Sequence, residues 1–191
     1  MRLITRNRRL TAIGCVLLAI PGLAGCNRDR TVEAAQEAAQ PPAATPAEQD
    51  FMRKIAEMDL SDIDMARLAL QKSANPEVRD FADTIQRDLT ASLEDLSSLM
   101  KAKGVSQPKI ASPEARQDAN RMAVLTGAEF DREFVNLIVA DDQKAVDMSR
   151  HLIGIAMDPD VKKYAENLMP KLEMHLEKGQ RLQSKLFRTT P

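Results

Sequence analysis

The sequence predicts an all-α protein whose main domain is an up-down-up-down four-helix bundle, built from two αα-hairpins. Apolar residues recur at the 3.6-residue spacing of amphipathic helices along four long segments. Short turns containing proline separate these segments, and no segment has the alternating pattern of a strand. The chain also repeats itself, since residues 51–99 match residues 134–182 at a constant offset (134 − 51 = 83).

The repeat is most specific at its turns. Asn75-Pro76-Glu77-Val78 matches Asp158-Pro159-Asp160-Val161, and Asp59 matches Asp142. Asn or Asp followed by Pro is typical of a helix start, because the side chain caps the helix and proline fits its first turn. Each half of the repeat is therefore predicted to be an αα-hairpin that turns at this motif.

The two hairpins are predicted over about residues 49–103 and 127–187. Gly104 follows the end of the first hairpin, and glycine readily adopts the backbone conformation that ends a helix. Pro170 lies inside the last helix and is predicted to kink it.

A shorter helix is predicted between the hairpins, over about residues 112–125. Ser112-Pro113 combines an N-cap residue with a proline in the first turn. Thr126 and Glu129 have the spacing of a capping box at the start of the third long helix. We expect the short helix to carry the chain across from one hairpin to the other.

Residues 1–25 have the pattern of a bacterial lipoprotein signal peptide. Four arginines precede a short apolar run over residues 10–25, which is shorter than a membrane-spanning helix needs. Leu23-Ala24-Gly25-Cys26 then resembles a lipobox, so that cleavage before Cys26 leaves its thiol and amine to receive lipid. The alternative is an N-terminal membrane anchor that is never cleaved.

Residues 26–48 are predicted to form a disordered tether between the lipid and a domain over residues 49–187. The tether is rich in Ala, Gln, Glu and Pro, has no apolar face, and contains prolines at 41, 42 and 46. Because Asn27 rather than Asp follows Cys26, the lipoprotein resemblance implies an outer-membrane location facing the periplasm.

Composition limits the chemistry of the mature chain. Removal of the signal peptide leaves 27 − 4 = 23 basic and 28 acidic residues, a formal charge of −5, with no basic stripe for nucleic acid. Cys15 is lost and Cys26 is used for lipid, so no disulfide is expected. No G-x-S-x-G, phosphate-binding glycine loop or HExxH is present. We predict no enzymatic activity and no cofactor; the expected partners are the membrane, through the anchor, and an envelope protein.

Four short motifs give the chain a family resemblance. They are Phe51-Met52-Arg53-Lys54-Ile55-Ala56-Glu57, Asn75-Pro76-Glu77-Val78 with Phe81-Ala82, Gly127-Ala128-Glu129-Phe130-Asp131 and Glu173-Met174-His175-Leu176. Through these four motifs, the chain resembles the bacterial domain of unknown function 4142 over residues 49–186. The resemblance implies a ferritin-like organisation of four helices in the outer membrane or periplasm. Members carry histidines at positions that align with Leu89, Asp142 and His175, and only His175 matches.

Several ionisable residues fall on the predicted apolar faces. Asp141 and His175 are equally far from the turn at Asp158 (158 − 141 = 17; 175 − 158 = 17). This spacing predicts that Asp141 and His175 face each other inside the bundle. Asp62 lies on the apolar face of the first helix, and Asp59 and Asp142 lie at face edges at a similar level.

These residues allow two interpretations. The first is a buried ion pair between Asp141 and His175, which fixes helix register. The second is a metal site formed by His175, Asp141, Asp142, Asp62 and Asp59. Di-iron bundles use Glu-x-x-His motifs, which this chain lacks, so the sequence favours the ion pair.

The predicted function follows from the anchor and the bundle together. The chain is expected to be a lipid-anchored helical-bundle protein of structural or interaction type. The alternative is a ferritin-like metal-binding protein or metallo-oxidase with a diverged ligand set.

Overall fold

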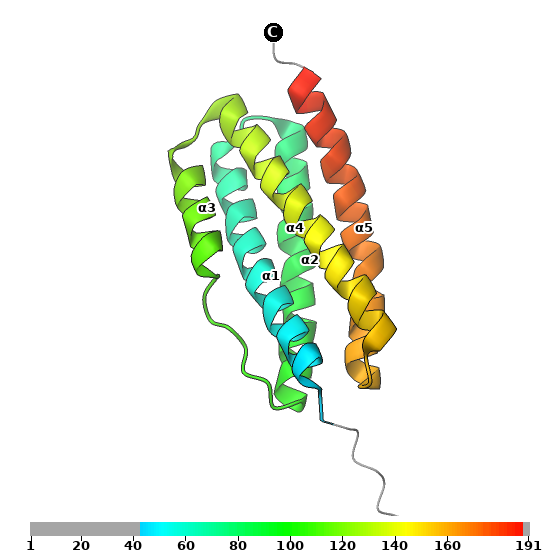
Figure 1. Ribbon diagram of the computed structural model, residues 1–191. Helices are drawn as coiled ribbons and strands as arrows, with labels where there is room; N and C mark the ends of the chain where they lie inside the picture. The colour runs from blue at the N-terminus through cyan, green and yellow to red at the C-terminus, as the bar shows by residue number, and fades with distance from the viewer. Residues whose placement is uncertain (1–42, 189–191) are drawn as a thin grey trace, which may run out of the picture. The chain divides into compact units, whose positions relative to one another are not determined.

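The computed structural model describes residues 43–188, which contain five helices and no strand (Figure 1). The all-α prediction is confirmed for this part of the chain, whereas the signal peptide and Cys26 lie outside it. None of the helices described is both long enough and apolar enough to cross a membrane. The helices are α1 (Pro46–Lys72), α2 (Pro76–Ala102), α3 (Pro113–Val124), α4 (Gly127–Ile155) and α5 (Pro159–Arg188).

Proline begins four of these helices, at the position where a missing backbone N–H costs least. Asn75 caps α2 by accepting a hydrogen bond from the backbone N–H of Glu77 at 3.0 Å, as predicted. Gly104 follows α2 with a φ of 67°, which suits glycine. The predicted capping box before α4 does not form, because the Thr126 side chain makes no capping hydrogen bond.

The start of α1 corrects the predicted extent of the tether. The helix begins at Pro46 rather than near residue 49, with Thr45 as its N-cap. Thr45 and Glu48 form a capping box, in which each side chain accepts a hydrogen bond from the other residue's backbone N–H. Pro46 was expected to block a helix, but at the first helical position it is compatible with one.

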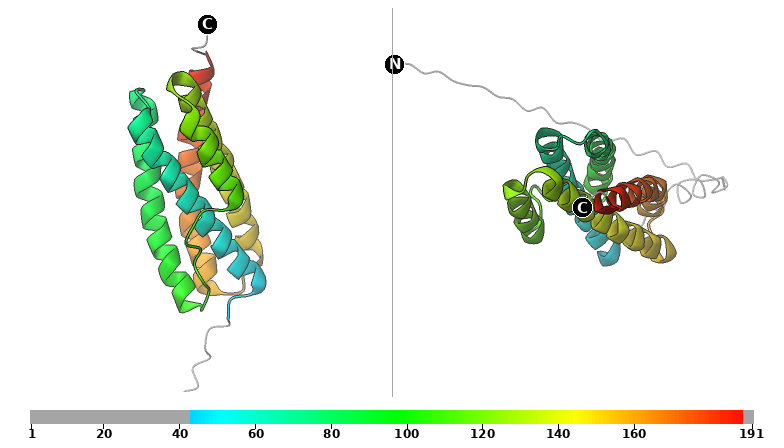
Figure 2. Two further views of the ribbon diagram at one scale, coloured as in Figure 1. Left: turned by 90° about the vertical axis from the view of Figure 1, so that its left-hand side faces the viewer. Right: turned by 90° about the horizontal axis from the view of Figure 1, so that it is seen from above.

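The long helices pack as two pairs, α1 with α2 and α4 with α5, which form the most extensive contacts. The pairs meet through α1 against α4 and α2 against α5. α3 lies outside the four long helices, against α1 and α4 (Figure 2). These pairs match the two predicted hairpins, with α3 as the predicted short helix between them.

The helix directions correct the predicted up-down-up-down order. Glu48 of α1 contacts Met157 and Asp158, which connect α4 to α5, and Lys103 at the end of α2 contacts Asp158 as well. We refer to this end of the bundle as the Glu48 end. α1 and α5 start there while α2 and α4 finish there, so the four long helices run up, down, down and up (Figure 1).

The connection between α2 and α4 explains this order. It leaves the Glu48 end and carries α3 toward the opposite end, where Lys72 of α1 donates to the carbonyl of Ala123 at 2.6 Å. The connection therefore travels back along the bundle before α4 begins. α3 acts as an additional upward pass, which reverses the direction expected for the second hairpin.

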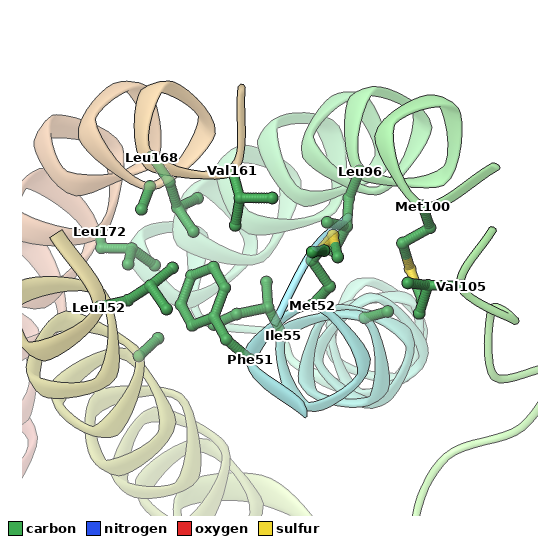
Figure 3. Packing of buried hydrophobic residues seen from close by; sticks show 14 of the residues in the cluster. Phe51, Met52, Ile55, Leu96, Met100, Val105, Leu152, Val161, Leu168 and Leu172 are labelled. Carbon is green, nitrogen blue, oxygen red and sulfur yellow. The ribbon is translucent and has the colours of Figure 1, made fainter. Parts of the chain in front are cut away.

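The core contains two apolar clusters. The cluster nearer the Glu48 end includes Phe51, Ile55, Leu96 and Leu172 (Figure 3). The other cluster lies toward the opposite end and includes the aromatic rings of Phe81, Phe130 and Phe134.

Gly179 marks a close approach between α5 and its neighbours. A Cβ atom at Gly179 would lie 2.7 Å from Val139 Cγ2 and 3.1 Å from Phe81 Cζ. We expect Gly179→Ala to lower the free energy of unfolding by about 2 kcal/mol, because overpacking forces buried side chains to shift. Urea denaturation measures this; Gly154→Ala, where no atom lies within 4 Å, is the control and is expected to be neutral or stabilising. Equal effects of the two substitutions would contradict the close approach.

Candidate functional site

The Glu48 end is held by a buried carboxylate. Glu48 is 1% exposed, and its Oε1 accepts hydrogen bonds from the backbone N–H groups of Met157 and Asp158, each at 2.7 Å. Burial alone would raise the pKa of Glu48, but these bonds and those from Thr45 hold the pKa below its ordinary value. Glu48 thus caps α1 and fixes the α4–α5 turn at the same time.

A second contact ties α2 to the same end. The Lys103 ammonium lies 2.7 Å from both Asp158 Oδ2 and Asp160 Oδ2, and the Lys103 side chain is 8% exposed. Asp158 Oδ1 accepts hydrogen bonds from the N–H groups of Asp160 and Val161 at the start of α5. These contacts stabilise the helix ends.

A polar layer separates the two apolar clusters at the middle of the bundle. Each long helix contributes at least one member that lies between residues of one cluster and residues of the other along the chain: Asp59, Asp62, Ser92, Asp142 and His175. The layer draws on all four long helices and consists of Asp59 and Asp62 from α1, Asp88 and Ser92 from α2, Asp142 from α4, and Tyr164 and His175 from α5.

The internal repeat relates the members of this layer. Asp59 and Asp142 are equivalent positions, as are Ser92 and His175 (175 − 92 = 83). Equivalent residues of the two hairpins therefore meet at the centre of the bundle. Ser92 and Tyr164 share a hydrogen bond of 3.0 Å on one side of the layer.

His175 is fully buried and is oriented by Asp88. Its Nε2 lies 3.1 Å from Asp88 Oδ2. Burial opposes the ionised form of Asp88, but the hydrogen bonds from His175 and Arg87 hold the Asp88 pKa below its ordinary value. Burial also lowers the pKa of His175, although Asp88 opposes this shift. The imidazole is therefore neutral near pH 7 and donates from Nε2, which leaves a lone pair on Nδ1.

The carboxyl groups of the layer lack sufficient partners. Asp59 Oδ2, Asp62 Oδ1, Asp142 Oδ2 and His175 Nδ1 are buried without a hydrogen-bond partner. His175 Nδ1 lies 3.9 Å from Asp142 Oδ1, which exceeds a normal hydrogen bond. The layer thus concentrates polar atoms whose hydrogen-bonding capacity is unused.

Burial and mutual repulsion raise the pKa values of these acids. Burial raises the pKa of Asp59 to about 7, against the effects of Ser92 and Lys171. Burial, then the charges of Asp141 and Asp59, raise the pKa of Asp142 to about 8. Burial and the neighbouring aspartates raise the pKa of Asp62 well above its ordinary value. Near pH 7, Asp142 is therefore mostly protonated and Asp59 is partly protonated.

The predicted pairing of Asp141 with His175 is wrong. Asp141 is half-buried and lies in a surface groove with Lys144 and Asp118, on the side of the bundle covered by α3. Burial raises its pKa, while Lys144 and a hydrogen bond with Asp62 oppose the shift. One residue further along α4, Asp142 turns toward the core and faces His175 instead. A single residue rotates a side chain by about 100° around a helix, which accounts for the difference.

Of the other predicted site residues, Asp142 faces His175, and Asp59 and Asp62 are buried nearby, where the charges of Asp59, Asp62 and Asp142 affect one another. Sequence reasoning missed Asp88, although it lies three residues after the core residue Ile85 and therefore on the same face of α2. In residues 43–188 as they stand, no three His, Cys, Asp or Glu side chains converge closely enough to hold a metal ion.

The fold and the layer define a class of protein: an all-helical bundle domain with an acidic layer in its core. The chain belongs to the family described as a domain of unknown function (DUF4142), whose model matches residues 33–182. This confirms the family resemblance found in the sequence. A search of curated protein sequences gave no significant match.

Solved structures share the fold. A DUF305 fragment from Deinococcus radiodurans has 21% identity and a TM-score of 0.68, covering 75% of this chain and 99% of that chain. A DUF305 protein from Streptomyces coelicolor has 14% identity and a TM-score of 0.61, covering 73% and 93%. CopM in its Cu(I)-bound form has 23% identity and a TM-score of 0.62, covering 72% and 96%. At these identities the similarity shows the fold alone.

Proposed function

We propose that the protein is a lipid-anchored component of the bacterial cell envelope, lipidated at Cys26 and facing the periplasm from the outer membrane. The observation that carries this proposal is the tetrapeptide Leu23-Ala24-Gly25-Cys26 after a basic start and a short apolar run. Membership of a family of unknown function is compatible with this proposal, and it assigns no activity to the chain.

The bundle itself would serve as a structural or interaction module. Within residues 43–188, the grooves are lined by scattered charged and apolar side chains, and the chemically unusual groups lie buried in the polar layer. No nucleophile with a neighbouring base emerges from the sequence motifs. An envelope protein that binds the bundle surface is the partner we propose.

Cu(I) binding, which one CopM structure displays, receives no support from the polar layer. The layer supplies carboxyl and hydroxyl oxygens and one imidazole nitrogen, whereas Cu(I) prefers thiolate and thioether sulfur. We therefore do not extend Cu(I) binding to this site.

Cys26→Ser tests the anchor. We expect it to abolish incorporation of radiolabelled palmitate and to release the protein from the outer-membrane fraction, because a chain without lipid lacks stable membrane attachment. Cys15→Ser, in the segment removed with the signal peptide, is the matched control and should keep both label and location. Labelled Cys26→Ser protein would refute lipidation at this residue.

In vivo cross-linking tests the interaction module. The wild-type lipoprotein is expected to give a specific cross-linked envelope protein, identified by mass spectrometry. An unrelated lipoprotein with the same anchor is the control. The same adducts from both proteins would show that the bundle itself selects no partner.

A further inference from the structure

We propose that the polar layer is a binding site for a divalent transition cation such as Zn²⁺, Mn²⁺ or Fe²⁺. The ligands are His175 Nδ1 from α5, the Asp142 carboxylate from α4 and the Asp59 carboxylate from α1. Asp88 from α2 positions the imidazole. This inference goes beyond the proposed function, which requires no metal.

The orientation of His175 is the first observation. A histidine that binds a metal through one nitrogen generally donates the other ring N–H to a carboxylate or carbonyl. His175 has this arrangement, because Nε2 lies 3.1 Å from Asp88 Oδ2 and Nδ1 is left without a partner. Nδ1 also lies on the side of the ring that faces Asp142, at 3.9 Å from Oδ1. The second ring nitrogen is thus buried with a lone pair that is available to a ligand.

The carboxylates are the second observation. Asp59 and Asp142 are 4% and 2% exposed, and each has an Oδ2 atom without a partner. Asp62, also buried, adds a third unpartnered oxygen close by. A buried polar atom without a hydrogen bond costs about 1–3 kcal/mol, so four of them in one layer are a substantial defect unless a ligand satisfies them. A cation satisfies oxygen and nitrogen lone pairs together.

The donor set determines the kind of cation. Imidazole nitrogen with carboxylate oxygen suits Zn²⁺, Fe²⁺ and Mn²⁺, whereas Ca²⁺ takes oxygen ligands alone. One histidine and two aspartates carry two negative charges when ionised, which match the charge of a divalent ion. The ion would lie where equivalent positions of the two hairpins meet and would join α1, α4 and α5.

Small side-chain movements are required for binding. The donors do not converge on one point in residues 43–188 as they stand. Two ligands of one tetrahedral zinc ion lie about 3.4 Å apart, given metal–ligand bonds of about 2.1 Å. The 3.9 Å between His175 Nδ1 and Asp142 Oδ1 is therefore within reach of a modest rotation of the Asp142 side chain. The third ligand requires a further movement, of Asp59, whose charge acts on Asp142.

Titration of the intact lipoprotein tests the proposal. The full chain is purified in detergent, stripped with a chelator, and titrated with Zn²⁺ or Mn²⁺ in air and with Fe²⁺ under anaerobic conditions, by calorimetry. We expect at least one of these cations to bind at one ion per chain, and the same cation to raise the melting temperature. His175→Ala is expected to abolish both effects. Asp88→Asn, which leaves all three ligands in place, should weaken binding by about 10–100-fold.

His151→Ala is the matched control, because His151 is the other histidine of the chain and is exposed on α4. It should bind like the wild type, whereas loss of binding in this variant would place the ion on the surface and overturn the proposal. If His175→Ala fails to fold by circular dichroism, Asp59→Asn replaces it with the same expected loss. Absence of one-to-one binding for all three cations, or retained affinity in the folded layer variants, would also overturn the proposal.

Discussion

Glu48→Ala is expected to lower the free energy of unfolding by about 3 kcal/mol, which corresponds to about 10 °C in melting temperature for a domain of this size. The substitution leaves the backbone N–H groups of Met157 and Asp158 without their acceptor, and the second of these groups is buried. It also removes half of the capping box with Thr45. Few other single side chains in the described bundle support two helix ends at once.

Urea denaturation at pH 7 measures this effect. Asp50→Ala is the matched control, since Asp50 lies two residues further along α1 and forms an exposed ion pair with Lys54. Exposed pairs contribute about 0–1 kcal/mol, so this variant should remain close to the wild type. Glu48→Gln keeps an oxygen acceptor and is expected to fall between the two. Equal losses in Glu48→Ala and Asp50→Ala would show that the Glu48 contacts do not hold the bundle end.

Asp142→Asn is expected to stabilise the cation-free protein by about 3 kcal/mol at pH 9 and to have little effect at pH 5. The folded state raises the pKa of Asp142 to about 8, so it binds a proton that the unfolded chain has already released. The part of the stability that depends on protonated Asp142 is therefore fully present below the pKa of this carboxyl in the unfolded chain, near 3.8. It is lost as the pH rises through about 8. Asparagine cannot ionise, so the variant escapes this loss.

The measurement is the free energy of unfolding between pH 5 and pH 9, in the presence of a chelator that removes competing cations. Asp147→Asn, at an exposed position on the same helix, is the control and should follow the pH dependence of the wild type. A wild-type protein as stable at pH 9 as at pH 5, or parallel profiles for Asp142→Asn and the wild type, would contradict the raised pKa.

The helices were largely predictable because their signals are local. Asn75-Pro76 and Gly104 mark helix ends through interactions within a few residues, and the structure places the ends there. The direction of the second hairpin was not predictable in this way. It depends on how far the connection through α3 travels before α4 begins, and no local signal reports that distance.

The candidate site, too, could be predicted only in part, because its contacts are not local in the sequence. Counting residues from the α4–α5 turn brought His175 to the correct level, but it selected Asp141 rather than its neighbour Asp142. The internal repeat held the better clue, because Asp142 is the equivalent of Asp59, which also lies in the layer. Asp88 was missed because α2 and α5 are not joined by a turn, so their relative register cannot be counted along the chain.

Glu48 was placed in the tether because alanine, proline and glutamine dominate the sequence before it. Its partners, Met157 and Asp158, lie 109 and 110 residues away, so their contact is visible only in the fold. Composition therefore did not reveal the role of Glu48.

The contacts at the Glu48 end also have a mechanical consequence. Any tension that reaches the bundle through the residues before Ala44 passes through Ala44 and Thr45 to Glu48, in the first turn of α1. The hydrogen bonds from Met157 and Asp158 to Glu48 are then the first long-range bonds to bear the load, and they pass it to the α4–α5 turn. A pulling experiment on the N-terminal side would therefore strain the junction of the two hairpins before either hairpin could unravel.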